Sequence, residues 1–243
     1  MTTASLNIAN VVAANPAVWN AETCAEVNAR LDDASAEEIA DWAVATFGNK
    51  LAVASSMQDT ILPHLFGARF AGVDVLFLET GYHFPETLET RDEAAKRFPI
   101  TIVNVTPRQT VAEQDAEFGK DLFASDPNTC CFMRKVDPLA RSLQGYDAWV
   151  TGARRVDAVT RANMPVVTWD ENHGLVKINP IAAWNDFQVE IYQTANGLPR
   201  NPLVAQGYPS IGCGPCTRKV AAGEDPRSGR WAGTDKTECG IHT

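Results

Sequence analysis

The segment LAVASSMQDT (51–60) decides the fold, because a short apolar strand runs directly into a polar loop. A helical pattern follows it in ILPHLFGARF (61–70). The same order of strand and helix then repeats twice, from the apolar strands VDVLFLET (73–80) and ITIVNV (100–105). Strands that alternate with helices predict an α/β fold, with an open and mostly parallel sheet and helices on both faces.

The rest of the chain extends this pattern in both directions. Ser35 and Glu38 form a capping-box motif at the start of a predicted helix. The predicted elements outside the central repeat are helices over 21–31, 36–48, 131–144 and 185–195, a strand over 147–152 and a hairpin over 166–178.

Three regions follow from these elements. We expect a flexible leader over residues 1–20 and a single α/β domain over 21–216. Residues 217–243 are rich in Gly, Arg and Pro and are expected to form a mobile C-terminal arm. The sequence leaves the oligomeric state open, a homo-oligomer included.

The composition excludes several classes of protein. The chain has 243 residues and a net charge of -9, and no apolar run approaches the ~20 residues needed to cross a bilayer. The start of the chain lacks the basic segment of a secretory signal, so we expect a cytoplasmic protein with no membrane partner. Residues 1–129 hold 8 basic and 19 acidic side chains, whereas residues 130–243 hold 13 and 11. Nucleic-acid binding is therefore not expected, but a small anion fits the second half.

Four cysteines form two short clusters, Cys130 with Cys131 and Cys213 with Cys216. In a cytosolic chain, clustered thiols indicate a metal site or catalysis before disulfides. Four sulfur donors suit zinc or an iron–sulfur cluster, and their spacing does not choose between these. A CxxC redox dithiol beside two core cysteines is the remaining alternative.

The other two cysteines stand apart. Cys24 lies in an amphipathic stretch and is expected to be an inert apolar side chain. Cys239 lies near Lys236 and His242, which would favour the reactive thiolate, although a tail cysteine without a role is the alternative.

Polar segments follow three of the predicted strands, at Ser55–Asp59, Glu79–His83 and Thr151–Arg161. Ligands of such sheets bind at the carboxyl ends of the strands, so the three segments are expected to meet in one crevice. Basic side chains gather in the cysteine-bearing half and suit a phosphate or sulfate ligand. They are Arg134, Lys135, Arg154, Arg155, Arg161, Arg218, Lys219, Arg227 and Arg230.

Three motifs together resemble the assimilatory adenylyl-sulfate (APS) reductases: CCFMRKVDPL (130–139), GYPSIGCGPCTR (207–218) and ECGIH (238–242). Shorter matches are ETG (79–81), TGARR (151–155), TR (160–161) and GEDPRSGRW (223–231). The resemblance runs from about residue 50 to the end of the chain. The loop SSMQD (55–59) departs from the more glycine-rich form of relatives, and the region around Trp184 is divergent.

The resemblance implies a fold of the adenine nucleotide α-hydrolase type and assigns roles to particular residues. Cys130, Cys131, Cys213 and Cys216 would hold one 4Fe-4S cluster, and Cys239 would be the catalytic nucleophile. The implied substrate-binding residues are Ser55, Ser56, Lys135, Arg161, Arg227, Arg230 and His242.

The resemblance also implies a reaction, the thioredoxin-dependent reduction of APS to sulfite and AMP through an S-sulfocysteine on Cys239. The nearest alternative is a 3′-phosphoadenylyl-sulfate (PAPS) reductase, but those enzymes usually lack the two cysteine pairs. A sulfur-transfer enzyme acting on tRNA would need glycines that Ser55–Asp59 lacks. A zinc-stabilised binding module would leave Cys239 and the arginines without a role.

Overall fold

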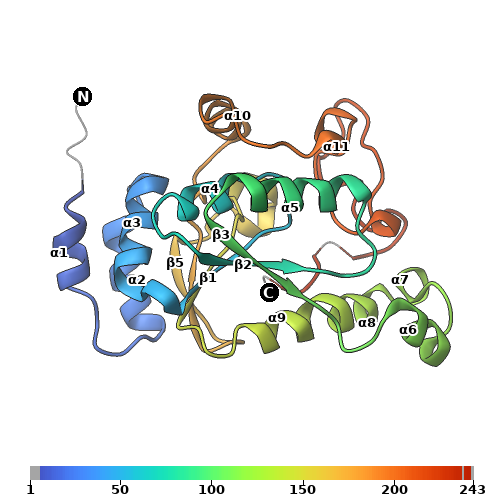
Figure 1. The fold of residues 1–243 in the computed structure, drawn as a ribbon, viewed down its shortest axis with the longest axis horizontal. Coiled ribbons are helices and arrows are strands. Elements are labelled where there is room, and N and C mark those ends of the chain that lie inside the picture. The colour runs from blue at the N-terminus through green and yellow to red at the C-terminus, as the bar shows by residue number, and fades with distance from the viewer. Residues whose placement is uncertain (1–5, 237, 242–243) are drawn as a thin grey trace.

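The computed structural model describes residues 6–236 and 238–241, and its centre is one six-stranded sheet (Figure 1). The strands are β1 (Leu51–Ala54), β2 (Val73–Leu78), β3 (Ile100–Val105), β4 (Ala148–Val150), β5 (Val167–Asp170) and β6 (Leu175–Ile178). Their order is β3-β2-β1-β4-β6-β5. All neighbours pair in parallel except the hairpin of β5 and β6. The predicted open, mostly parallel sheet is confirmed.

The middle strand β1 fixes where a ligand can bind. Its Val53 aligns with Val75 of β2 on one side and with Val150 of β4 on the other. The chain continues from β1 through β2 to β3, and then returns to place β4 on the opposite side of β1. The order of the strands therefore reverses between β1 and β4, and this switch point leaves a crevice at their carboxyl ends.

Helices cover both faces of the sheet, as expected. The α-helices are α1 (Ile8–Ala13), α2 (Ala21–Leu31), α3 (Ala36–Phe47), α4 (Ile61–Gly67), α5 (Pro85–Arg97), α6 (Val111–Phe118), α7 (Leu122–Ser125), α8 (Pro127–Cys131), α9 (Asp137–Ser142), α10 (Asp186–Ala195) and α11 (Pro202–Ala205). Short helical turns are η1 (Gly48–Lys50), η2 (Phe132–Val136, π-helical), η3 (Arg155–Asp157), η4 (Val159–Arg161) and η5 (Gly214–Cys216). Among the described residues no helix has the length and apolarity of a membrane span.

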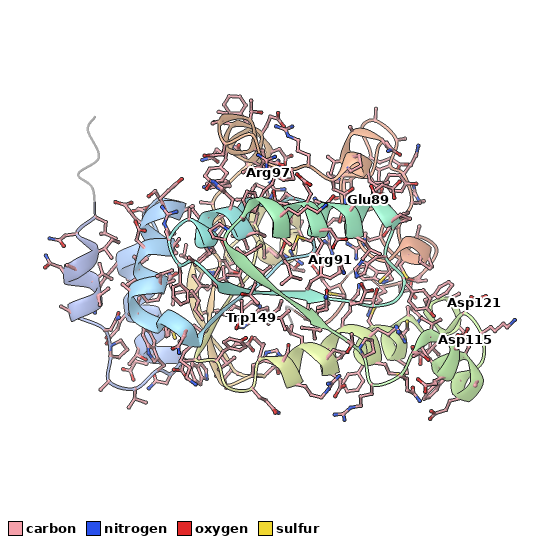
Figure 2. All side chains as sticks on the ribbon, viewed as in Figure 1. Glu89, Arg91, Arg97, Asp115, Asp121 and Trp149 are labelled. Atoms are coloured by element: carbon pink, nitrogen blue, oxygen red, sulfur yellow. The ribbon has the colours of Figure 1, made fainter. Side chains whose placement is uncertain are left out.

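Successive strand residues point into two separate cores, because side chains alternate across a strand. On one face, Val53 and Val75 pack with α2, α3 and α4, and this core includes the fully buried Trp42. On the other face, Ala52 and Trp149 (labelled in Figure 2) pack with side chains of α9. The two cores hold the carboxyl edge of the sheet rigidly between them.

The N-terminal region differs in part from the prediction. The capping box of Ser35 and Glu38 is present at α3, with the Ser35 amide donating to the Glu38 carboxylate at 2.9 Å. Helix α1 lies within the segment predicted to be a flexible leader, and its Val11 joins the core beside α3. A six-residue helix shows too little apolar periodicity to be predicted from sequence.

The helix predicted over 131–144 is three elements. Asp126 caps α8 by accepting hydrogen bonds from the Asn128 and Thr129 amides, so the helical region begins at Pro127. It then widens into the π-helical turn η2 before α9, where Pro138 supplies no backbone N–H. A proline disturbs the preceding turn of a helix, which explains the change of spacing.

The predicted C-terminal arm lies against the domain within the described residues. Thr217 and Arg230 form an antiparallel bridge, and Trp231 is only 4% exposed. The Lys236 ammonium donates a hydrogen bond to Asn128 of α8 at 2.6 Å, and Ile241 packs against the core beside α9. The arm thus crosses the carboxyl edge of the sheet. Its mobility stays a prediction.

Candidate active site

A cavity of about 860 Å³ lies at the carboxyl ends of β1, β2 and β4. Ser55 and Asp59 of the first predicted segment line it, together with Thr80 and His83 of the second. The third segment contributes residues from Thr151 to Arg161. The expected meeting of the three polar segments is confirmed, except that Glu79 pairs instead with Arg91 at 3.4 Å.

The first loop is held in shape by its own side chains. The Ser55 hydroxyl accepts a hydrogen bond from the Met57 amide at 3.3 Å, and Met57 has a positive φ of 57°. The Gln58 amide group donates to the Pro209 carbonyl and accepts from the Ile211 amide, so it fastens this loop to the segment before Cys213. Ser55 and Ser56 both line the cavity, where their hydroxyls can reach an anion.

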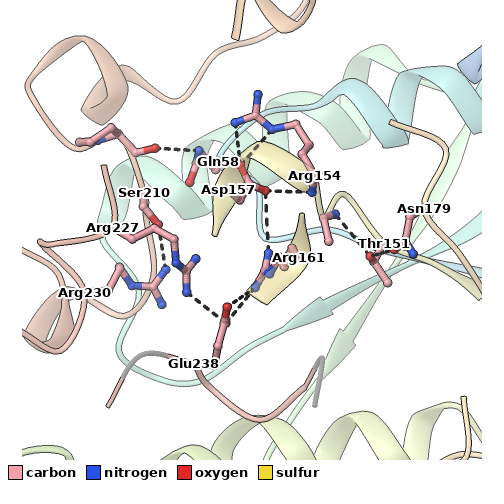
Figure 3. A network of polar contacts seen from close by, with 12 residues as sticks. Gln58, Thr151, Arg154, Asp157, Arg161, Asn179, Ser210, Arg227, Arg230 and Glu238 are labelled. Atoms are coloured by element: carbon pink, nitrogen blue, oxygen red, sulfur yellow. Dashed lines mark hydrogen bonds and ion pairs between the residues drawn. The ribbon is translucent and has the colours of Figure 1, made fainter. Parts of the chain in front are cut away.

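The four predicted substrate-binding cations, Lys135, Arg161, Arg227 and Arg230, all line the same cavity, and Arg154 and Arg200 line it as well. Arg161 and Arg227 both donate to the Glu238 carboxylate, at 2.8 and 3.1 Å (Figure 3). The Arg230 guanidinium lies over the Trp231 ring, 4.6 Å from its centroid, and donates to the Ser210 hydroxyl at 3.3 Å. The predicted substrate-binding cations are therefore brought together, whereas His242 lies outside the described residues.

Cys239 is half-buried and lines this cavity with the four cations. Burial disfavours the charged form of Lys135, but the charge interactions with Cys213 and then Cys239 outweigh it and raise the pKa of the lysine. Burial also lowers the pKa of Arg230, with Arg227 as the next cause. The arm thus brings a thiol into the cavity that these cations line.

The other four predicted site cysteines line a second, smaller pocket next to the first. They are Cys130, Cys131, Cys213 and Cys216, and none of them forms a disulfide. Burial, followed by the neighbouring thiols, raises the pKa of Cys130 to about 12. Burial would raise the pKa of Cys213 as well, but Lys135 and Thr80 bring it below the ordinary value.

Lys135 lines both pockets, as does Cys213. The smaller pocket lined by the four cysteines (the four-thiol pocket) and the 860 Å³ cavity lined by the cations (the anion cavity) therefore share a wall. Within residues 6–236 and 238–241, no three His, Cys, Asp or Glu side chains are grouped to hold a single metal ion.

The sequence analysis missed Glu238 and expected another role for Arg134, which it counted among the basic side chains that suit an anion. Arg134 is 3% exposed and donates hydrogen bonds to the Thr80 carbonyl and to Gln114. Glu238 joins two arginines of the cavity wall. Neither residue type identifies such a role in a sequence, because most arginines and glutamates lie on the surface.

Comparison with known proteins identifies the family. A profile of the phosphoadenosine phosphosulfate reductase domain matches residues 49–219. The adenosine 5′-phosphosulfate reductase of Mycolicibacterium smegmatis is 59% identical over 88% of this chain and 91% of its own length. That of Streptomyces coelicolor is 55% identical over 87% and 90%.

Solved structures show the same relationship. The phosphoadenylyl-sulfate reductase of Candida auris, in a phosphate complex, superposes with a TM-score of 0.71 at 29% identity, over 84% of this chain and 98% of that one. An FMN adenylyltransferase of Candida glabrata shares the fold alone, with a TM-score of 0.54 at 11% identity over 87% of this chain and 71% of that one. This likeness agrees with the adenine nucleotide α-hydrolase type of fold. The chain belongs to the phosphoadenosine phosphosulfate reductase family, together with relatives named adenosine 5′-phosphosulfate reductases.

Proposed function

We propose that this protein reduces APS to sulfite and AMP, with thioredoxin as the reductant and with an S-sulfocysteine on Cys239 as the intermediate. The observation that carries the proposal is the presence of Cys239 in one cavity with four cations, at the switch point of the sheet. The names of the relatives, at 51–59% identity, support APS as the substrate.

The cavity suits a dianionic phosphosulfate attached to a nucleoside. Guanidinium groups bind phosphate and sulfonate oxygens through two parallel hydrogen bonds, and Arg161, Arg227 and Arg230 offer three of these groups. Ser55 and Ser56 add hydroxyl donors at the end of β1. The 860 Å³ volume is ample for the adenosine beside them.

In the first step the Cys239 thiolate attacks the sulfur of the sulfo group. A bond forms between Cys239 Sγ and that sulfur, the bond from sulfur to the phosphate oxygen breaks, and AMP leaves with the electron pair. The negative charge that develops on the phosphate oxygen is stabilised by the guanidinium groups and by Lys135.

The second step consumes two electrons from thioredoxin. One thioredoxin thiolate attacks Cys239 Sγ, and sulfite leaves with the electron pair of the sulfur–sulfur bond. The second thioredoxin thiol then resolves the mixed disulfide, which regenerates Cys239 and leaves thioredoxin oxidised. We place this reaction in the cytoplasm, where such thiols are kept reduced.

We also propose that Cys130, Cys131, Cys213 and Cys216 hold one 4Fe-4S cluster. Four soft sulfur donors around one pocket fit it, and adjacent cysteines such as Cys130 and Cys131 reach the corners of a cube more readily than one tetrahedral ion. When bound, the cluster would order this wall of the site and add an electrostatic field. Lys135 would link the bound cluster to the substrate, because it lines both pockets.

The proposal is tested with Cys239→Ser and APS labelled in its sulfo group. We expect the wild-type protein to retain label covalently until thioredoxin releases it as sulfite, and the variant to retain none. Label that remains on the variant would overturn the mechanism. Sulfite release from PAPS that exceeds release from APS would overturn the choice of substrate, for which the Candida auris relative provides the comparison.

A further inference from the structure

The residue before the nucleophile, Glu238, pairs with two arginines of the cavity wall. The Glu238 carboxylate accepts hydrogen bonds from one Arg161 nitrogen on both of its oxygens, at 2.8 and 2.9 Å (Figure 3). The Arg227 guanidinium adds a third at 3.1 Å. The three side chains are only 11–20% exposed, so solvent screens these ion pairs less than pairs on the surface.

Cys239 lies between Glu238 and a second anchor. On the far side, Ile241 packs against the core of Ala52, Leu76 and α9. Between them, Gly240 has a positive φ of 87°, a conformation that glycine adopts without strain. The Glu238 pairs and the Ile241 contact together hold the thiol over the cavity.

The same two arginines are those expected to receive the substrate's anionic groups. In the structure both guanidinium groups donate to a carboxylate, which carries two oxygens and a negative charge as a sulfonate or phosphate edge does. Arg161 has a further acidic neighbour, Asp157, at 3.8 Å. An incoming anion therefore meets two guanidinium groups that already share the Glu238 carboxylate.

We propose that Glu238 is a positioning residue that ties Cys239 to the arginine wall and competes with the substrate anion for Arg161 and Arg227. This inference rests on the proposed function, since it takes that anion to be the phosphosulfate. Loss of the carboxylate frees the arginines for a ligand and releases the thiol. Anion affinity should then rise while the reaction of Cys239 with substrate slows, whereas general damage to the site would weaken both.

The first measurement needs no substrate. Purified holoprotein is treated with iodoacetamide, and alkylation of Cys239 is followed by mass spectrometry on the tryptic peptide 237–243, which holds no other cysteine. We expect Glu238→Gln to alkylate about tenfold faster than wild type, as for loss of a partly buried ion pair. Glu224→Gln is the matched control on the same arm, because Glu224 pairs with the exposed Arg218 outside the cavity.

The second measurement separates the effect of the Glu238 charge from the effect of its side-chain length. AMP affinity is measured by calorimetry, and covalent adduct formation by single turnover with labelled APS. For Glu238→Gln we expect AMP to bind about three- to tenfold tighter and the adduct to form about tenfold more slowly. Glu238→Asp keeps the charge on a shorter side chain, so its AMP affinity should stay near wild type while its adduct forms slowly.

Alkylation that is equally fast in wild type and Glu238→Gln would overturn the positioning role. Weaker AMP binding in Glu238→Gln would overturn the competition. A wild-type protein that forms no adduct with APS would contradict the proposed function instead, and the alkylation rates would still decide on Glu238.

Discussion

The Thr80 hydroxyl lies 3.3 Å from Cys213 Sγ, although 133 residues separate the two in the chain. Thr80 is fully buried just after β2, and Cys213 begins the CxxC segment. The Gly214 amide also donates to the Tyr82 carbonyl at 2.7 Å. The carboxyl end of β2 therefore fixes the second cysteine pair, so the sheet that forms the anion cavity also shapes the four-thiol pocket.

Replacing Thr80 with Val should destabilise this junction. The Thr80 hydroxyl also accepts a hydrogen bond from the Tyr82 amide at 3.2 Å, and valine would leave that half-buried amide without this partner. We expect the free energy of unfolding to fall by about 1–3 kcal/mol. Urea denaturation measures it, with Thr80→Ser as the control that keeps the hydroxyl. A Thr80→Val variant as stable as wild type, or one that loses less stability than Thr80→Ser, would contradict the role of the hydroxyl.

Arg134 should be a second structural determinant of the site. Its guanidinium donates to the Thr80 carbonyl and to Gln114 at 2.9 Å, and it lies 5.3 Å from the centroid of the Tyr82 ring. Arg134→Met would leave these buried acceptors unpaired and cost about 3 kcal/mol of stability. Arg108→Met is the matched control, because the Arg108 side chain is 68% exposed. Urea midpoints compare the two, and similar values would refute the role of Arg134.

The central fold could be predicted from the sequence because its strands are short apolar runs bounded by polar loops. The segment 100–105 was predicted with the bounds that β3 has, since its apolar residues form one short run. Helix α1 and the π-helical turn η2 could not be predicted. Their shapes depend on packing against α3 and on Pro138, and neither leaves a periodic pattern.

The residues of the site could be predicted where their type alone suggests a function. The roles of residues that act through buried contacts could not be predicted. Cysteines are rare enough that their clusters marked the second pocket directly. Glu238 and Arg134 are charged residues in ordinary surroundings along the chain, and only the fold brings them to buried partners. A contact across 77 positions, as between Arg161 and Glu238, depends on the path of the arm, which no local pattern encodes.

The proposed cluster predicts a measurable iron content. Anaerobically purified protein should be brown and hold ~4 iron atoms and acid-labile sulfide per chain, the content of one 4Fe-4S cluster. Cys130→Ser should lose most of this iron, because a ligand of the pocket is removed. Cys24→Ala is the control and should keep its iron, since Cys24 is fully buried in the core with α3 and α4 and does not line the pocket. A colourless zinc protein would contradict the assignment.

Acid should destabilise the protein in part through His64. Burial, with Arg69 and Arg97, lowers the pKa of this histidine below its usual 6.5, and its Nδ1 lies 3.0 Å from the Tyr192 hydroxyl. Between the lowered folded pKa and 6.5, the unfolded chain binds a proton that the folded chain does not. The free energy of unfolding should therefore fall as the pH drops below 6.5.

His64→Gln tests this sign, because glutamine can still contact Tyr192 but does not titrate. The variant should be less stable than wild type at about pH 7.5. The difference in free energy of unfolding should narrow towards about pH 5, because acid removes the contribution of the neutral His64 from wild type, and the variant has no such group to lose. Burial lowers the pKa of His83 too, so both proteins should keep some acid sensitivity from that site. Urea midpoints across this range give the result. A difference that widens on acidification would mean that the folded protein favours the charged imidazole, contrary to the effect of burial and of the charges of Arg69 and Arg97.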